Sequence, residues 1–363
     1  MARQMKLTKH WRRYLATDPS AVARTYGDEP SPLPYPEGWF LLVPSAEVRT
    51  GQVVTRRLMG QDVVVYRTRG GRVGVVRAHC PHLGAHLANG RVDGETIVCG
   101  FHHFAFDGQG EVVAVGPGYT RLPKSCRLPV LRSAEADGGV FVWTGAAEPA
   151  WQPPDLLSPR HTRPHYQTFD LFTHPQEVVE NTVDIRHVNA MHGYRDATLI
   201  EGPTSDGHLF SFTARLLRTY VPFGTVQVDA EITMYGLGFV SVAFRAPSLG
   251  LEQSLLFSAR PVEPWRVHFV IGTSVLIDPP DGRAARIPPA VTKAVARALS
   301  PVYQRLALGD LNQDFQIWYG KRYLNPPRVA YGEGPIGPFR KWAQQFYPDP
   351  PLSLDPQPTA RDD

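Results

Sequence analysis

Two short segments that each contain one cysteine and one histidine decide the fold of the N-terminal part of the chain. Residues 80–84 read Cys-Pro-His-Leu-Gly, and residues 99–102 read Cys-Gly-Phe-His. Each segment offers one thiolate and one imidazole, and two such loops can hold a [2Fe–2S] cluster with the thiolates on one iron and the imidazoles on the other. A tetrahedral zinc site is the alternative, but zinc fingers group cysteine with cysteine and histidine with histidine. The spacing therefore favours the cluster.

The sequence around these segments is typical of an all-β domain. Short runs of β-branched residues alternate with glycine-containing turns between residue 38 and about residue 144. The runs lie at residues 53–54, 63–66, 73–76, 97–98, 112–113 and 140–143. Prolines then become frequent, and their missing N–H donors discourage regular structure. We therefore predict an N-terminal extension over residues 1–35, a β domain over 36–148 and a proline-rich linker over 149–164.

The rest of the sequence predicts a second domain over residues 165–348, which makes the protein α+β. A helical pattern covers about 176–192, strand-like alternation covers 208–275, and a helix covers about 291–324, which we expect to be interrupted near Pro301. The strand segments carry many aromatic and aliphatic residues and few charges, as a sheet around an apolar pocket would. Residues 349–363 contain several prolines and little to bury, so we expect a disordered tail.

Composition excludes several classes of protein. The 38 basic and 34 acidic residues give a net charge of only +4, so a nucleic-acid partner is not expected. Three cysteines exclude a disulfide framework. No apolar stretch approaches the roughly 18 residues of a membrane-spanning helix, and no signal peptide is apparent. We therefore expect a cytoplasmic protein without an integral membrane segment.

Polar side chains recur in the helical stretch of the second domain. Glu180, Asp184 and His187 follow one another at i, i+4 and i+7, on one face of a helix. His192 lies five residues after His187, about 140° away on an ideal helix. The two imidazoles can therefore bind one ion only if the helix distorts or ends between them. Two readings remain open from the residues alone, a solvated helix face and part of a metal site.

The two cysteine–histidine segments resemble the Rieske family, whose pattern is C-x-H, a spacer and C-x-x-H. The resemblance implies four cluster ligands, one pair for each iron: Cys80 with Cys99, and His82 with His102. The family usually has proline where Gly100 stands, and often glycine where His103 stands. Because the third cysteine, Cys126, lies outside both loops, the oxygenase or ferredoxin type fits better than the type found in cytochrome bc complexes, which carries extra bridging cysteines.

The stretch from residue 180 to residue 192 resembles the iron-binding motif of Rieske non-haem iron oxygenases. By that resemblance His187 and His192 would bind Fe(II). A facial triad needs one carboxylate in addition, which must come from elsewhere in the chain. This second resemblance implies a catalytic domain in which an antiparallel sheet and helices enclose a mononuclear iron.

The last predicted helix offers two candidates for that carboxylate, Asp310 and Asp314, four residues apart on one face. Residues 313–318, Gln-Asp-Phe-Gln-Ile-Trp, resemble the carboxylate-bearing helix of the steroid 9α-hydroxylase oxygenases. We therefore expect Asp314 to be the third iron ligand and keep Asp310 as the alternative. The sequence that follows, from residue 321 to residue 347, is similar to that group and to the cholesterol 7-desaturases.

The resemblance implies the oxygenase component of a two-component system, which uses dioxygen and NAD(P)H for hydroxylation, desaturation or demethylation. The implied substrate is a hydrophobic polycyclic compound, a steroid or sterol. An oxygenase of smaller aromatic compounds, or a non-catalytic Rieske electron carrier, are the alternatives. No dinucleotide fingerprint is present, so a flavin reductase, directly or through a ferredoxin, would supply the electrons.

The resemblance also implies assembly into a homotrimer in which the cluster of one subunit faces the iron of the next. Asp184 would then be the electron-transfer bridge between the two sites, accepting a hydrogen bond from His102 across the interface. The alternative is that Asp184 only orients His187 within its own subunit.

Overall fold

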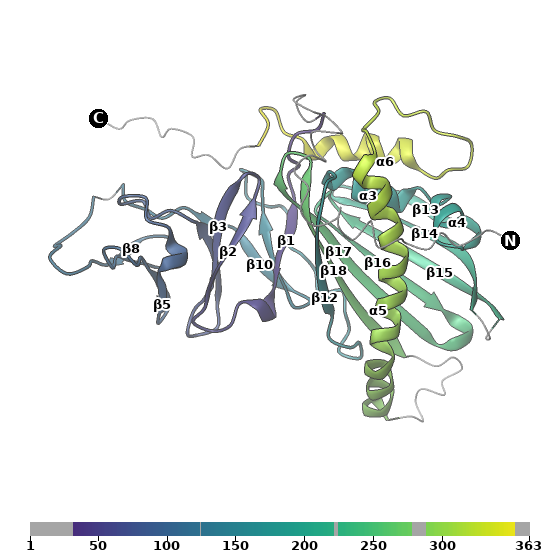
Figure 1. The fold of residues 1–363 in the computed structure, drawn as a ribbon, viewed down its shortest axis with the longest axis horizontal. Helices are drawn as coiled ribbons and strands as arrows, with labels where there is room; N and C mark the ends of the chain where they lie inside the picture. The colour runs from purple at the N-terminus through teal and green to yellow at the C-terminus, as the bar shows by residue number, and fades with distance from the viewer. Residues whose placement is uncertain (1–31, 124, 221–223, 278–287, 353–363) are drawn as a thin grey trace. The chain divides into compact units, whose positions relative to one another are not determined.

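Three small antiparallel sheets make up residues 37–155, which are the first of two units of the chain (Figure 1). The structure is a computed structural model, and it describes residues 32–123, 125–220, 224–277 and 288–352. The sheets are β1 (Trp39–Pro44), β11 (Gly139–Trp143) and β10 (Ser133–Ala136); β2 (Val53–Leu58), β3 (Gln61–Arg67), β4 (Val73–Arg77) and β9 (Val130–Leu131); and β5 (Arg91–Asp93), β6 (Thr96–Val98), β7 (Ala105–Phe106) and β8 (Val112–Ala114). All six β-branched runs predicted from the sequence lie in these strands, and the runs at 63–66, 97–98 and 140–143 are buried in the interior of the unit.

A seven-stranded antiparallel sheet forms the second unit, residues 156–349. In spatial order its strands are β12 (His165–Leu171), β18 (Arg266–Ile277), β17 (Leu251–Glu263), β16 (Phe239–Ala246), β15 (Gly224–Tyr235), β14 (Leu209–Tyr220) and β13 (Arg195–Asp206). Burial alternates along β15 and β14, as in Phe210, Phe212, Ala214 and Leu216 of β14. This alternation gives the sheet one apolar face.

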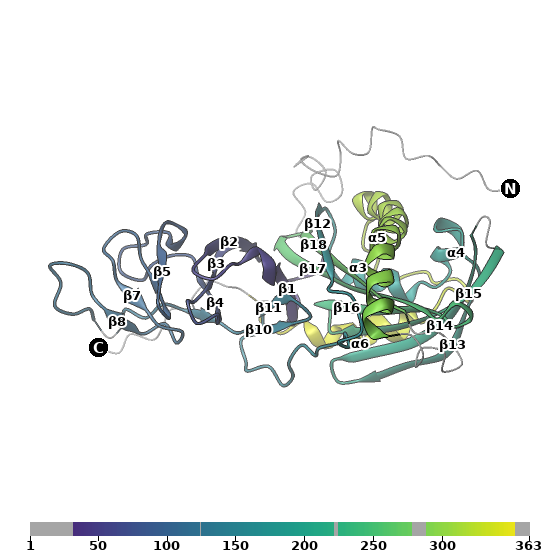
Figure 2. The same cartoon turned by 90° about the horizontal axis from the view of Figure 1, so that it is seen from below.

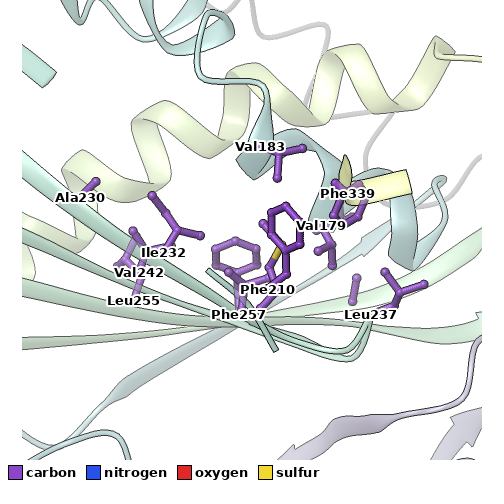
Figure 3. Close-up of a cluster of buried hydrophobic side chains, with 14 of the residues drawn as sticks. Val179, Val183, Phe210, Ala230, Ile232, Leu237, Val242, Leu255, Phe257 and Phe339 are labelled. Atoms are coloured by element: carbon purple, nitrogen blue, oxygen red, sulfur yellow. The ribbon is translucent and has the colours of Figure 1, made fainter. Parts of the chain in front are cut away.

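Helices cover the apolar face of this sheet. They are α3 (Pro175–Val183), α4 (His187–Met191), α5 (Pro289–Gly320) and α6 (Ile336–Ala343), and Figure 2 shows α5 lying along the sheet, where it packs mainly on β18. In Figure 3, Val179 and Val183 of α3 lie over Phe210 and Phe257 of the sheet, with Phe339 of α6 beside them. Three sheets in one unit and a sheet with helices in the other confirm the α+β class. Among the described parts of the chain, no helix is long and apolar enough to span a membrane.

Two short helices replace the single one predicted over 176–192. The helix α3 ends at Val183, and Asp184, with φ −79° and ψ 79°, leaves the helical conformation. The Asp184 carboxylate then accepts a hydrogen bond from the backbone N–H of His187, at 3.2 Å, where α4 begins. An aspartate side chain competes with helix continuation in this way, and the apolar pattern alone does not reveal it.

The predicted interruption near Pro301 is wrong. The helix α5 runs unbroken from Pro289 to Gly320 with Pro301 inside it. A proline removes one backbone hydrogen bond of a helix, and the packing of this long helix on the sheet outweighs that loss. The predicted tail, residues 349–363, and the predicted extension, residues 1–35, lie outside the described residues except for 349–352 and 32–35.

Candidate metal centres

Two matching turns hold the cysteines of the first unit. Cys80 follows β4 and Cys99 lies between β6 and β7, and both are buried. The N–H of Gly84 donates to the carbonyl of Cys80 at 2.9 Å, and the N–H of His103 donates to the carbonyl of Cys99 at 3.1 Å. Gly84 and His103 both have a positive φ, 76° and 60°. His103 therefore occupies a left-handed position that glycine adopts more easily, at a cost of about 1 kcal/mol.

The histidine rings of the two turns face each other. The Nδ1 atoms of His82 and His102 lie 3.2 Å apart, and the ring centroids 4.7 Å apart. Burial, with a smaller contribution from the neighbouring Cys99 thiol, raises the pKa of Cys80 to about 12. Two buried thiols and two imidazoles converge here, and a metal bound by the thiols would displace their protons. The donor set fits a [2Fe–2S] cluster with mixed ligands.

The loop after β8 supports the histidines, and the sequence pattern gave it no role. The ring centroid of Tyr119 lies 5.8 Å from that of His82 and 5.7 Å from that of His102. A Cβ atom at Gly116 would lie 1.7 Å from the carbonyl oxygen of His102, so only glycine fits there. A glycine-rich turn in the sequence indicates a tight bend, but not the loop against which it packs.

Gly100 has a similar steric requirement. A Cβ atom at Gly100 would lie 2.2 Å from the carbonyl oxygen of Asn89. The proline usual at this position in the Rieske family would therefore need the Asn89 backbone to move.

Replacing His103 by glycine should leave the cluster in place, whereas replacing His102 by glycine should destroy it. The first change relieves a left-handed side-chain conformation and should raise the free energy of unfolding by up to about 1 kcal/mol. The second removes one of the four expected ligands. Iron and sulfide content, together with the electron-spin signal of the reduced protein, would measure both effects. Loss of the cluster in His103→Gly alone would assign the ligand role to His103 instead.

Three side chains from separate elements converge in the second unit. His187 begins α4, His192 follows its last residue, and Asp314 lies on α5. The Oδ1 atom of Asp314 lies 3.3 Å from Nε2 of His192 and 3.8 Å from Nε2 of His187, and the three possible ligand atoms all lie within 4.8 Å of one another. The two imidazoles meet because α4 ends at Met191, so His192 is no longer held at the helical angle. Their ring planes are 87° apart.

The protonation of His187 suits a metal ligand. Its Nδ1–H donates to the backbone carbonyl of Asp184, so Nε2 keeps its lone pair. Burial lowers the pKa of His187, which favours the neutral ring. The lone pairs of two imidazoles and one carboxylate then converge, and a bound cation would stabilise that arrangement. The set of two nitrogens and one oxygen fits Fe(II) with open positions.

Asn181 adjoins this centre, although the sequence pattern assigned it no function. Its Nδ2 atom lies 3.2 Å from Nε2 of His187. The residue was visible in the motif between Glu180 and Asp184, but an amide side chain by itself does not indicate a metal.

Glu180 does not share a polar face with Asp184 and His187, as the predicted helix required. Both of its carboxylate oxygens lie 2.7 Å from the guanidinium of Arg340 on α6. Glu180 is buried, and this pair joins α3 to α6. Its role in the structure is to hold α3, because the helix breaks before the stripe could form.

Asp310, the alternative carboxylate, binds an arginine instead. Its two oxygens lie 2.6 and 3.2 Å from the guanidinium of Arg218 on β14, which also donates to the Tyr194 hydroxyl at 2.9 Å. Although burial opposes it, the pKa of Arg218 is raised by its hydrogen bonds to Asp310 and by Tyr194. Tyr194 lies two residues after His192, so this group ties α5 and β14 to the segment that carries a metal-site histidine.

An apolar cavity adjoins the three converging side chains, which form part of its wall. Ala214 and Ala230 lie directly opposite each other on β14 and β15, and Ala307 of α5 also lines the space, so small side chains create it. Water-molecule centres can occupy about 140 Å³ of the cavity. That volume is close to the roughly 150 Å³ of a cavity that holds one benzene ring, so a larger ligand would extend out of it.

Comparisons with known proteins agree with both units. The Rieske [2Fe–2S] domain matches residues 38–125, and the 3-ketosteroid 9α-hydroxylase C-terminal domain matches residues 142–347. A Rieske domain followed by such a catalytic domain is the composition of a Rieske non-haem iron oxygenase. The chain belongs to this class of enzymes and, within it, to the 3-ketosteroid 9α-hydroxylase family. The family and the enzyme class expected from the sequence are thereby confirmed.

Relatives of known name match nearly the whole chain. Cholesterol 7-desaturase nvd from Bombyx mori is 29% identical over 89% of this chain and 72% of its own length. A probable 3-ketosteroid-9-alpha-monooxygenase oxygenase component from Rhodococcus rhodochrous is 28% identical over 92% of this chain and 85% of its own length. Among solved structures, the QL mutant of Pseudomonas putida NdmA with theobromine aligns with a TM-score of 0.64 at 14% identity, over 84% of this chain and 89% of that one. Dicamba monooxygenase aligns with a TM-score of 0.58 at 16% identity, over 85% and 95% of the two chains. These two structures support the fold.

Proposed function

We propose that this protein is the oxygenase component of a two-component system that oxidises a steroid or sterol. The observation that carries the proposal is the geometry of the second unit, in which two histidines and one carboxylate form part of the wall of an apolar cavity. The relatives named above act on cholesterol and on 3-ketosteroids, and both are rigid, apolar, polycyclic compounds. The product is hydroxylated, desaturated or demethylated.

In this proposal His187, His192 and Asp314 hold Fe(II), which when bound activates dioxygen next to the substrate. The Asp184 carbonyl keeps the proton on Nδ1 of His187 and so leaves Nε2 for the metal. Apolar side chains exclude water from the reacting carbon and hold the substrate against the metal centre. The Arg218–Asp310 pair fixes α5 against β14.

Electrons would reach the second unit through the Rieske cluster, held by Cys80, Cys99, His82 and His102. Because the sequence has no dinucleotide fingerprint, a separate flavin reductase, with or without a ferredoxin, would take them from NAD(P)H. We further propose the homotrimer implied by the family, with the Asp184 carboxylate as the bridge between the cluster of one subunit and the iron of the next. The protein would then work in the cytoplasm, where such reductases are available.

Product analysis tests the proposed substrate class. The protein, loaded with iron and cluster, is incubated with a surrogate reductase, NADH and air, with a panel of sterols, 3-ketosteroids and small aromatic acids. We expect mass spectrometry to detect a steroid or sterol that has gained an oxygen atom, lost two hydrogens or lost a methyl group. Turnover of small aromatic acids alone would overturn the proposal, and would favour the alternative substrate class.

Filling the cavity should separate substrate binding from metal binding. Ala230→Leu adds three carbon atoms where Ala214 and Ala307 leave space, so we expect steroid turnover to fall by roughly 10-fold or more while both metal contents stay unchanged. Ala243→Leu is the matched control, because Ala243 lies on β16 next to the inward-facing Val242 and therefore faces the other side of the sheet. Equal turnover in the two variants would contradict the placement of the substrate.

A further inference from the structure

One amide side chain lines the cavity far from the converging histidines. Gln253 lies on β17, two residues before the inward-facing Leu255, and lines the cavity. Its Nε2 donates to the backbone carbonyl of Tyr303 on α5, at 3.0 Å. A backbone carbonyl only accepts hydrogen bonds, so this contact fixes which end of the amide is nitrogen.

The other end of that amide is a hydrogen-bond acceptor. Oε1 of Gln253 accepts no hydrogen bond from the described residues, so this acceptor is available to a ligand in the cavity. An acceptor in an apolar space binds a hydroxyl group, which can donate, and repels a carbonyl oxygen, which cannot.

Other polar side chains that line the cavity either bind another part of the protein or lie at a different level of α5 from Tyr303. The Thr182 hydroxyl donates to the carbonyl of Val179 within α3, at 2.7 Å. The Arg218 guanidinium binds Asp310, one turn of α5 before Asp314. A buried donor, Nε1 of Trp318, has no hydrogen-bond acceptor among the described residues, but Trp318 lies one turn beyond Asp314.

Gln253 and the metal centre therefore lie at different levels of the cavity. Tyr303, which Gln253 contacts, precedes Asp314 by eleven residues of the continuous helix α5. Eleven residues correspond to about 16 Å along a helix axis. A substrate bound at both places must be long, with its polar group well separated from the reacting carbon.

We infer that Gln253 is a specificity-determining residue that selects a substrate with a hydroxyl group, a 3-hydroxysterol, over the corresponding 3-ketosteroid. The inference rests on the proposed function and deepens it, since both compounds belong to the proposed substrate class. In the bound state the sterol hydroxyl donates to Oε1 of Gln253, and the Tyr303 carbonyl holds the amide in place. A ketone has no hydrogen to donate and would leave Oε1 without a partner.

Binding of a matched ligand pair tests the inference. The saturated alcohol 5α-cholestan-3β-ol and the ketone 5α-cholestan-3-one have the same carbon skeleton, and only the oxygen function differs. Dissociation constants are measured by equilibrium dialysis with the iron-loaded and cluster-loaded protein, without reductant, so that neither compound is turned over. We expect the alcohol to bind about 10-fold more tightly than the ketone.

Two variants separate recognition by Gln253 from a general effect on packing. Gln253→Leu removes the acceptor, and we expect the ratio of the two dissociation constants to fall to within about 2-fold of unity. Thr182→Val also changes a residue that lines the cavity, but its hydroxyl is used inside α3, so the ratio should stay near 10-fold. Metal content and circular dichroism establish that each variant is folded.

The outcomes distinguish this inference from the proposed function. If the wild type binds neither compound, the steroid or sterol substrate is wrong. If it binds both equally, or the ketone more tightly, a steroid-binding function stands and the role of Gln253 is overturned, with Arg218 or Trp318 as the donor. If the roughly 10-fold ratio of the two dissociation constants persists in Gln253→Leu, the role of Gln253 is overturned as well.

Discussion

Asp314→Ala should abolish product formation and lose the mononuclear iron, while the spectrum of the cluster stays unchanged. Asp314 supplies the only carboxylate oxygen within 4 Å of the two imidazole Nε2 atoms in the described parts of the chain. Two histidines alone hold iron weakly, so we expect turnover to fall by more than about 100-fold. Iron analysis should give about two atoms per chain instead of about three, since the cluster keeps its own.

Asp310→Asn is the control for this variant. The amide oxygen of asparagine can still accept a hydrogen bond from Arg218, so the α5–β14 contact persists in part. We expect Asp310→Asn to retain the mononuclear iron and most of the activity. If Asp310→Asn loses the iron and Asp314→Ala retains it, the carboxylate of the triad is Asp310.

Asp184→Asn should block electron transfer from the cluster to the mononuclear iron without removing either. The asparagine side chain can still accept the hydrogen bond from the backbone N–H of His187, and the backbone carbonyl still accepts from His187 Nδ1. The substitution therefore removes the negative charge and keeps the position of His187. In a single turnover, the pre-reduced cluster of the variant should stay reduced when substrate and dioxygen are added, whereas the wild-type cluster is reoxidised.

Asp170→Asn is a suitable comparison, because Asp170 also pairs with a histidine, His268, but on the sheet at β12 and β18. It should reoxidise like the wild type. Coupled reoxidation in Asp184→Asn would leave Asp184 with the local role that the structure describes, that of holding α4. Sedimentation of the wild-type protein tests the trimer separately, and a monomer would contradict the bridge between subunits.

The spacing of cysteines and histidines was sufficient to predict the first unit, because both turns are local. Each ligand pair lies within four consecutive residues, and the β-branched runs around them specify strands by their period of two. What could not be predicted was the support behind the turns. Gly116 and Tyr119 contact the histidines because β8 pairs with β7, and no local sequence pattern predicts that contact.

The second unit was harder to predict, because its site is assembled from distant segments. Nothing in the periodicity near His187 indicates that Asp314 will lie beside it, and only the family resemblance selected it over Asp310. Two strands, β12 and β13, were missed for a different reason. Most of β13 is exposed, with Ala197 its one buried residue, so the alternation that reveals a half-buried strand is absent.

The unbroken course of α5 has a consequence for how the enzyme can diverge. Tyr303, Asp310 and Asp314 belong to one rigid element, so their mutual spacing changes only by whole residues, each about 1.5 Å and 100°. A deletion of one residue would rotate the carboxylate away from His187 and His192. The helix therefore sets the length of an acceptable substrate. Substitutions of Ala214 and Ala230 on the strands can change the acceptable width gradually. Related enzymes that exchange one substrate for another of equal length need only alter the sheet.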